Sequence, residues 1–175
     1  MRLFIAINFP PEIKVAMAAI RDVIKHTALC GNFTFDENLH LTLVFLGECD
    51  FRQTETIKSV IAETQFPEFT LVLEKAGYFK RDSGNTWWIG LSENKSLLDL
   101  QAGLTKRLQQ SGFPLVNRRY VPHVTIGREV KMRAGFVHPE IPKAAFNVTN
   151  IELMKSERIN GKLTYMPVYS KNVYS

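Results

Sequence analysis

Cysteine is scarce in this sequence and forms no recognisable functional pattern. Only two of the 175 residues are cysteine, Cys30 and Cys49. They make neither a Cys-x-x-Cys pair nor the framework of a small disulfide-rich protein. These absences argue against a disulfide scaffold and against a cysteine-based metal or redox site. A reducing cytoplasm is therefore the expected compartment.

The sequence also has no long apolar run. No stretch approaches the ~18 apolar residues that a membrane-spanning helix needs. The first apolar run, which starts at Leu3, is too short for the core of a secretion signal, and Pro10 and Pro11 follow it. We therefore expect no membrane association and interpret this run as a buried first strand.

Low-complexity segments and obvious linkers are missing as well. With 45% apolar and 22% charged residues, the composition is typical of a globular protein that buries its core without disulfides. A single domain is the simplest organisation for 175 residues. We expect a monomer.

Acidic residues are under-represented in the second half of the chain. Residues 1–83 carry 9 basic and 11 acidic side chains, a balance of −2, whereas residues 84–175 carry 13 and 6, a balance of +7. Five basic residues fall within sixteen positions: Arg118, Arg119, Arg128, Lys131 and Arg133. Such a cluster attracts phosphate, and nucleic acid is its commonest partner. A solvated basic surface explains the cluster equally well, so charge alone does not decide between them.

Apolar periodicity predicts an α+β fold. Strands are expected at Leu3–Asn8, Leu39–Leu46, Phe69–Leu73, Trp87–Leu91, His123–Gly127, Phe146–Met154 and Leu163–Tyr169. Helices are expected at 12–27, 51–63 and Ser96–Gln110. The apolar side of the first helix is expected to consist of Val15, Ala19, Ile20, Val23 and Ile24.

The second half of the chain repeats the order of the first half at a constant spacing. Phe4 and Trp87 are 83 residues apart, and so are His40 and His123. Two strands and the helix between them therefore recur in phase, which favours an internal duplication over coincidence. We predict one domain built of two similar lobes, approximately 1–83 and 84–175.

Each predicted lobe has one His-x-Thr-x pattern in its second strand. The copies are His40-Leu41-Thr42-Leu43 and His123-Val124-Thr125-Ile126. Because side chains alternate along a strand, histidine and threonine share one face and the apolar residues occupy the other. The apolar face suits packing against helices, so the two polar faces are predicted to meet across one groove. Chance explains two such copies among four histidines roughly one time in a thousand on this composition.

Two histidines and two threonines around one phosphate suit the opening of a cyclic phosphodiester. Water must lose a proton, and the departing ribose oxygen must gain one. Histidine, with an ordinary pKa of ~6.5, can do either, and each positioned proton transfer typically supplies ~10²–10⁴-fold. The hydroxyls of Thr42 and Thr125 can donate to phosphoryl oxygens that gather charge in the transition state. Arg128, at the end of the second motif strand, can add a charge-assisted contact.

These motifs and their flanks resemble the 2H phosphoesterases, named for their two His-x-Thr-x motifs, and within them the RNA 2′,3′-cyclic phosphodiesterases once called 2′-5′ RNA ligases. The matching stretches are Arg2-Leu-Phe-Ile-Ala-Ile-Asn-Phe-Pro-Pro, Glu37-Asn-Leu-His-Leu-Thr-Leu-Val-Phe-Leu-Gly-Glu and Pro122-His-Val-Thr-Ile-Gly-Arg. The likeness extends over nearly the whole chain. It implies two pseudo-symmetric α+β lobes, each an antiparallel sheet with helices on its outer face, that form a central groove.

The resemblance also implies an activity and a role for each motif residue. The family converts a 2′,3′-cyclic phosphate end of RNA into a 2′-phosphate end, and it also joins ends weakly through a 2′-5′ linkage. By this likeness His40 is the proton donor to the leaving 3′ oxygen, and His123 is the proton acceptor from water. Thr42, Thr125 and Arg128 hold the phosphate. The partner is RNA, and no metal or other cofactor is implied.

Two other kinds of function remain open at this point. A 2H relative that acts on 2′-5′ oligonucleotides or on small cyclic nucleotide phosphates would use the same catalytic groups. A non-catalytic RNA-binding module would keep the fold and the basic residues. The intact His-Thr pair in both halves counts against this second reading, because binding alone needs no acid–base pair.

The remaining histidines and the aromatic residues have weaker signals. His26 and His138 are expected to be structural or exposed, and no histidine has a carboxylate or thiolate partner at zinc-ligand spacing. Arg118 and Arg119 are equally compatible with guiding an RNA backbone and with a simple surface role. Four aromatic residues can stack on a base, and we single out none of them: Phe9, Trp87, Trp88 and Tyr120. Trp87 and Trp88 must point to opposite faces of one strand.

Overall fold

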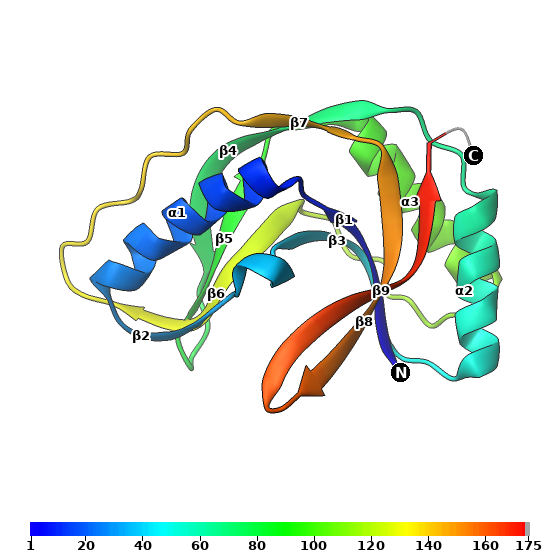
Figure 1. The fold of residues 1–175 in the computed structure, drawn as a ribbon, viewed down its shortest axis with the longest axis horizontal. Coiled ribbons are helices and arrows are strands. Elements are labelled where there is room, and N and C mark those ends of the chain that lie inside the picture. Colours follow the sequence, from blue (N-terminus) through cyan, green and yellow to red (C-terminus); the bar gives the residue numbers. More distant parts are fainter. Residues whose placement is uncertain (174–175) are drawn as a thin grey trace.

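The computed structural model describes residues 1–173, which form two antiparallel sheets and the helices that cover them (Figure 1). The helices are α1 (Pro11–Thr27), the short 3-10 helix η1 (Asp36–Asn38), α2 (Phe51–Glu63) and α3 (Lys95–Gln110). The strands are β1 (Arg2–Asn8), β2 (Ala28–Phe33), β3 (His40–Glu48), β4 (Phe69–Phe79), β5 (Asn85–Leu91), β6 (His123–Met132), β7 (Ala145–Val148), β8 (Asn150–Ile159) and β9 (Lys162–Asn172). The predicted α+β class with antiparallel sheets is confirmed.

Each sheet combines strands from both halves of the sequence. The first sheet has the order β3-β1-β8-β9, and the second has the order β2-β6-β5-β4-β7. The two strands of each predicted repeat are neighbours, β1 with β3 and β5 with β6. Strands β8 and β9 nevertheless join the first sheet, while β2 and β4 join the second. A division of the chain at residue 83 therefore does not describe the sheets, because hydrogen-bonded pairing between distant strands leaves no mark in local periodicity.

Most predicted elements occur, and the differences have local causes. The expected strand Phe146–Met154 is two strands, because the chain passes from one sheet to the other between β7 and β8. Strand β2 was not predicted, since its residues alternate in neither polarity nor burial. The final strand is longer than expected and forms a hairpin with β8.

The first helix buries a different side from the one that periodicity predicted. Val15 is 69% exposed and Val23 is 49% exposed, so their expected place in the core is wrong. The buried side consists of Ile13, Met17, Ala18, Ile20 and Ile24. Two apolar stripes overlap on this helix, and only the one that contacts β2 and β6 is covered.

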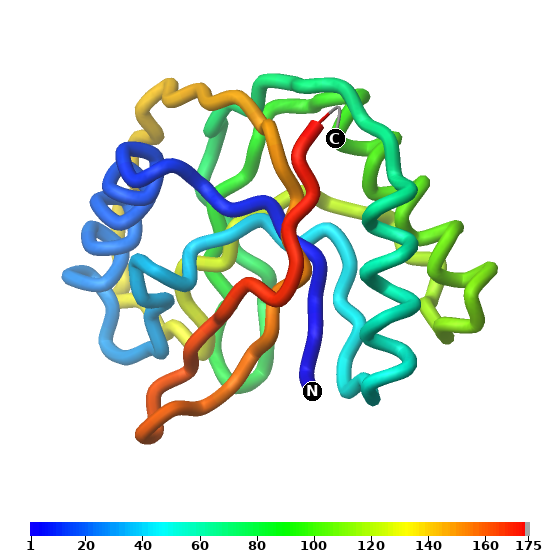
Figure 2. The backbone as a smooth tube through the Cα atoms, turned by 45° about the vertical axis from the view of Figure 1, so that its right-hand side comes forward, coloured from blue at the N-terminus to red at the C-terminus, as the bar shows by residue number. Residues whose placement is uncertain are grey.

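The helices cover the outer faces of the sheets and leave the inner faces toward each other. Helix α1 packs on the second sheet, whereas α3 contacts β3 and α2 contacts α3 and β9. Figures 1 and 2 show α1 on one side of the molecule and the α2–α3 pair on the other. The strand residues beneath the helices form one continuous apolar core, including Leu41, Leu43, Val124 and Ile126. Within residues 1–173, no helix is long and apolar enough to cross a membrane.

Candidate active site

The two His-x-Thr-x motifs begin equivalent strands, one in each sheet. His40 is the first residue of β3 and His123 is the first residue of β6. The apolar motif residues are at most 3% exposed, whereas both histidines and both threonines are partly exposed. This burial pattern is the alternation that the sequence predicted, with the polar residues on the inner faces.

Both histidine rings are fixed by the same backbone contact. His40 Nδ1 lies 2.7 Å from the carbonyl oxygen of Asn38, and His123 Nδ1 lies 2.7 Å from that of Val121. A carbonyl oxygen can only accept, so Nδ1 carries the proton and donates in both cases. In the neutral ring, Nε2 is then left as the atom that exchanges a proton with a substrate. Each motif thus presents a histidine in a defined tautomer.

His40 lies in a desolvated aromatic setting. Its ring centroid is 4.8 Å from that of Phe4 and 5.0 Å from that of Tyr165. The pKa of His40 is lowered from 6.5 to about 4, mainly by burial and in smaller part by the positive charges of Lys14, Arg128 and His123. The hydrogen bond to the Asn38 carbonyl opposes this shift. At neutral pH the ring is therefore uncharged, and the Thr42 hydroxyl donates to its Nε2 at 3.0 Å.

Contacts between the two sheets bring the motifs to one region. Strand β3 contacts β6, and the Tyr120 hydroxyl donates to the carbonyl oxygen of Thr42 at 2.9 Å, just before the second motif begins. The charges of His123 and Arg128 are close enough to act on His40. Residues 78 and more positions apart in sequence therefore share one electrostatic environment.

His123 has a more open setting than His40. Its nearest described ring is Phe79, with centroids 5.3 Å apart in an edge-on arrangement. Phe79 in turn contacts Trp88, 5.5 Å away, which lies opposite Thr125 in the sheet. Trp88 covers Gly77, where an added Cβ would lie 2.5 Å from the indole. A glycine is thus required there for the indole to lie flat on this inner face.

Arg128 is exposed at a kink in β6. The next residue, Glu129, has a positive φ of 55°, and Gly84 packs so closely on it that a Cβ would lie 2.6 Å from its carbonyl carbon. The carboxylate of Glu129 accepts a hydrogen bond of 2.6 Å from Asn32. Within residues 1–173, Arg128 makes no ion pair, so its charge is available to an anion.

The other residues that the sequence singled out divide between core and surface. Phe9 and Trp87 are 6% and 0% exposed and belong to the core, so neither can stack on a base. Trp88 is on the opposite face of its strand from Trp87, as predicted. His26 is exposed and lies 2.6 Å from the carbonyl oxygen of Asp22 through Nδ1. His138 packs beside aromatic rings away from the motifs: Tyr78, Trp87 and Phe136.

Sequence reasoning missed the residues that surround the histidines. Phe4, Tyr165 and Phe79 contact the two rings, and Asn38 supplies the carbonyl that orients His40. The proximity of Asn38 to His40 is local and was readable in principle. Tyr165 had no such signal, because its position depends on the pairing of β9 with β8 and of β8 with β1.

No group of three or more His, Cys, Asp or Glu side chains within residues 1–173 is arranged to hold a metal ion. The donors near the histidines are instead hydroxyls, an arginine and a lysine. Such a set binds an anion rather than a cation. The arrangement can therefore hold a phosphate between two imidazoles and exchange protons with it.

The sequence is similar to known proteins over most of its length. A family model described as the 2′-5′ RNA ligase superfamily matches residues 9–160. A Thermotoga maritima protein named RNA 2′,3′-cyclic phosphodiesterase is 34% identical over 131 residues, which are 73% of this chain and 70% of that protein. An Escherichia coli protein of the same name is 30% identical over 172 residues, 95% of this chain and 93% of that protein. The crystal structure of E. coli LigT complexed with 3′-AMP superposes with a TM-score of 0.86 at 29% identity, covering 99% and 98% of the two chains.

Proposed function

Because the chain belongs to the 2′-5′ RNA ligase superfamily, we propose that it is an RNA 2′,3′-cyclic phosphodiesterase that produces 2′-phosphate ends. The observation that carries this proposal is the matched pair of histidines, each held through Nδ1 by a backbone carbonyl so that Nε2 is left for proton transfer. Relatives that bear this activity in their names match most of the chain. A hydrolase needs such a pair, whereas a binding module does not.

In the proposed reaction, a water oxygen attacks phosphorus as the bond from phosphorus to the 3′ oxygen breaks. His123 accepts the proton of the water, and His40 donates a proton to the departing 3′ oxygen. Thr42, Thr125 and Arg128 donate to the non-bridging oxygens, where negative charge increases in the transition state. After turnover both imidazoles return to their starting states by exchanging protons with solvent.

A proton donor must be protonated, and the low pKa of His40 in the free protein is compatible with that role because the negative charge of the substrate raises it. In the free protein, burial and nearby cations keep the ring neutral. A bound phosphate brings a negative charge to the same place, which favours the charged ring and raises its pKa. Protonated Nε2 can no longer accept from Thr42, so that hydroxyl becomes free to donate to the phosphate. Substrate binding would thus protonate His40 and, at the same time, free the Thr42 hydroxyl to bind the phosphate.

We further propose a monomeric enzyme of the cytoplasm that needs no metal and has weak 2′-5′ ligase activity. Both cysteines are free thiols, Cys30 exposed and Cys49 buried, which is compatible with a reducing compartment. Ligation would be the same ring opening with a ribose 5′ hydroxyl in place of water: the 5′ oxygen attacks phosphorus, His123 accepts its proton, and the bond to the 3′ oxygen breaks to leave a 2′-5′ linkage.

The experiment that tests the function is incubation with an RNA that ends in a 2′,3′-cyclic phosphate, in excess chelator, followed by phosphorus NMR of the product end. A 2′-phosphate end is expected. His40→Ala and His123→Ala should each lower turnover by about 10²–10⁴-fold. His26→Ala, which removes a comparable ring bonded to a backbone carbonyl, should keep full activity. A 3′-phosphate product, or binding without turnover, would contradict the proposal. If the protein cleaved 2′-5′ oligonucleotides and no cyclic phosphate end, the alternative function of a 2H enzyme for 2′-5′ oligonucleotides would be supported instead.

A further inference from the structure

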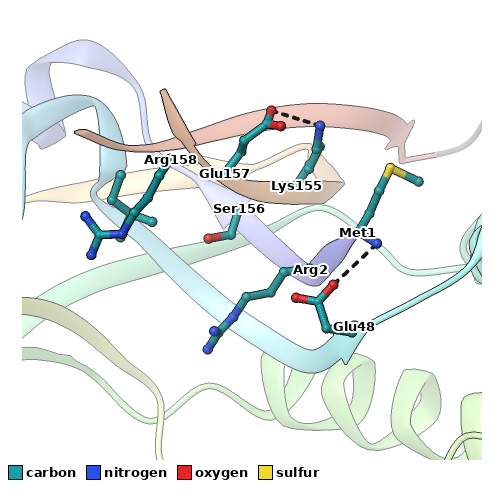
Figure 3. Close-up of a pocket in the computed structure, with 8 residues that line it drawn as sticks. Met1, Arg2, Glu48, Lys155, Ser156, Glu157 and Arg158 are labelled. Atoms are coloured by element: carbon teal, nitrogen blue, oxygen red, sulfur yellow. Dashed lines mark hydrogen bonds and ion pairs between the residues drawn. The ribbon is translucent and has the colours of Figure 1, made fainter. Parts of the chain in front are cut away.

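A hollow outside the two motifs lies at the outer end of the first sheet. A hollow of about 380 Å³ is located where the start of β1 meets the β8–β9 hairpin. Its charged and polar lining includes Arg2, Ser156 and Arg158 (Figure 3). In Figure 3 these three side chains lie on one side of the sheet, whereas Lys155 and Glu157 lie on the other.

Strand pairing connects this hollow to the histidines. Arg2 is opposite Ser156, and Ser156 is opposite Tyr165, whose ring contacts His40. Along β1, Arg2 follows the same face as Phe4, which also contacts His40. One two-residue step along a strand is about 7 Å. The hollow is therefore adjacent to the candidate active site rather than remote from it.

The charge of the hollow is positive because its acidic residues are already paired. Glu157 is paired with Lys155 at 2.8 Å, and Glu48 with the N-terminal amine at 3.4 Å. Neither arginine has a carboxylate partner within residues 1–173. Arg158 donates to the carbonyl oxygen of Gly161, at 3.0 Å, and the Arg2 guanidinium lies 5.2 Å from the centroid of the Phe45 ring.

Tyr165 lies between the hollow and the proposed phosphate site and is influenced by an arginine of each. Burial raises the pKa of the Tyr165 hydroxyl, and the charges of Arg128 and Arg2 oppose that rise. Tyr165 therefore lies within the electrostatic reach of both arginines, one from each site. A chain of phosphates is the ligand that matches two adjacent positive sites of this kind.

We propose that Arg2, Ser156 and Arg158 bind the phosphate on the 5′ oxygen of the nucleoside that bears the cyclic end. In RNA this phosphate is the linkage to the preceding nucleotide. The inference rests on the proposed function and deepens it, because it makes an RNA end, rather than a lone cyclic mononucleotide, the preferred substrate. Arginines of this kind position the backbone without reading the base.

The test compares kcat/KM for three substrates: a cyclic mononucleotide, a dinucleotide with the same cyclic end, and that dinucleotide with an uncharged methylphosphonate linkage. The unmodified protein should prefer the charged dinucleotide by about tenfold or more over both others. Arg2→Gln and Arg158→Gln should each remove most of this preference and leave the mononucleotide rate unchanged. Arg133→Gln, an exposed arginine outside the hollow, is the matched control and should keep the preference.

Each other outcome identifies what is wrong. Equal rates on the three substrates, or variants that lower all rates equally, would overturn the second site while leaving the proposed function intact. If Arg133→Gln alone removed the preference, the linkage phosphate would bind at the basic cluster of residues 118–133 instead. That result would also overturn the second site. No hydrolysis of any cyclic substrate would contradict the proposed function itself.

Discussion

The surroundings of His40 and His123 differ although their backbone geometry is the same. Each ring donates through Nδ1 to the carbonyl oxygen of the residue two positions earlier, at 2.7 Å. His40 also packs between Phe4 and Tyr165, and its pKa falls to about 4. Among residues 1–173, the one aromatic neighbour of His123 is Phe79, and His123 follows a loop. The repeated motif thus gives both histidines the same tautomer. The side chains around the rings differ, so the two rings lie in different environments.

The inequality suggests how one fold can obtain an acid and a base from the same residue type. A ring that is desolvated and surrounded by cations responds strongly to an incoming anion, because the anion reverses the local charge. The pKa of His40 should therefore rise when a phosphate binds beside it.

The largest effect is expected from removing either histidine. His40→Ala and His123→Ala should each lower kcat by about 10²–10⁴-fold on the natural cyclic phosphate. The two variants should then differ on a substrate whose leaving 3′ oxygen is replaced by sulfur, since a thiolate leaves without a proton. Sulfur should restore much of the activity of His40→Ala and little of that of His123→Ala. If sulfur instead restored the activity of His123→Ala, His123 would be the proton donor and His40 the proton acceptor.

Replacing the motif threonines should have the next largest effect. Thr42→Val and Thr125→Val should each lower kcat by about 10²-fold, because each removes a donor to the charged transition state. Only Thr42 bonds to a histidine in the free protein, so only Thr42→Val should also raise the pKa of His40, measured by NMR titration of the ring. Thr42→Ser is the control and should recover activity. Equal pKa changes in both valine variants would contradict this asymmetry.

The pH dependence of kcat/KM should report the pKa of His40 in the free protein, and that of kcat its pKa in the bound protein. If His40 acts as an acid, it must be protonated, so kcat/KM should decrease as pH rises above about 4, the value for the free protein. Bound phosphate raises that pKa, so the decrease in kcat should begin at a higher pH, by one unit or more. Steady-state kinetics measured across the pH range test both predictions, the one for kcat/KM and the one for kcat. A kcat/KM that rises through pH 4 to a plateau would make His40 the base.

The smallest effect is expected from opening the pocket of His40. Tyr165→Ala admits water to the His40 ring, which weakens desolvation and raises the pKa of His40 toward 6.5; activity should change by about tenfold or less. Tyr165→Phe keeps the ring and should leave the pKa low. Phe79→Ala is the matched change beside His123 and should not affect His40. NMR titration of the His40 ring distinguishes these cases, and an unchanged pKa in Tyr165→Ala would contradict the role of burial.

Much of the candidate site was predictable because its key residues follow a local rule. Strict alternation places His40 with Thr42 and His123 with Thr125, and the observed burial of the apolar residues between them agrees with it. Helical periodicity, in contrast, predicted the wrong side of helix α1, where two apolar stripes overlap and only packing selects one. Neither alternation nor the internal repeat specifies how the sheets are assembled, because each sheet takes strands from both halves of the chain.

The sequence by itself determined the α+β class, the two His-x-Thr-x motifs and the family, since each depends on residue types at short, regular spacings. Only the tertiary structure decided which strands pair, and therefore that Tyr165 lies beside His40 and that Arg2 and Arg158 line one hollow. The physical reason is that strand pairing and desolvation depend on contacts between distant segments. Many strands of similar pattern can pair in principle, and the packing of the whole chain selects among them.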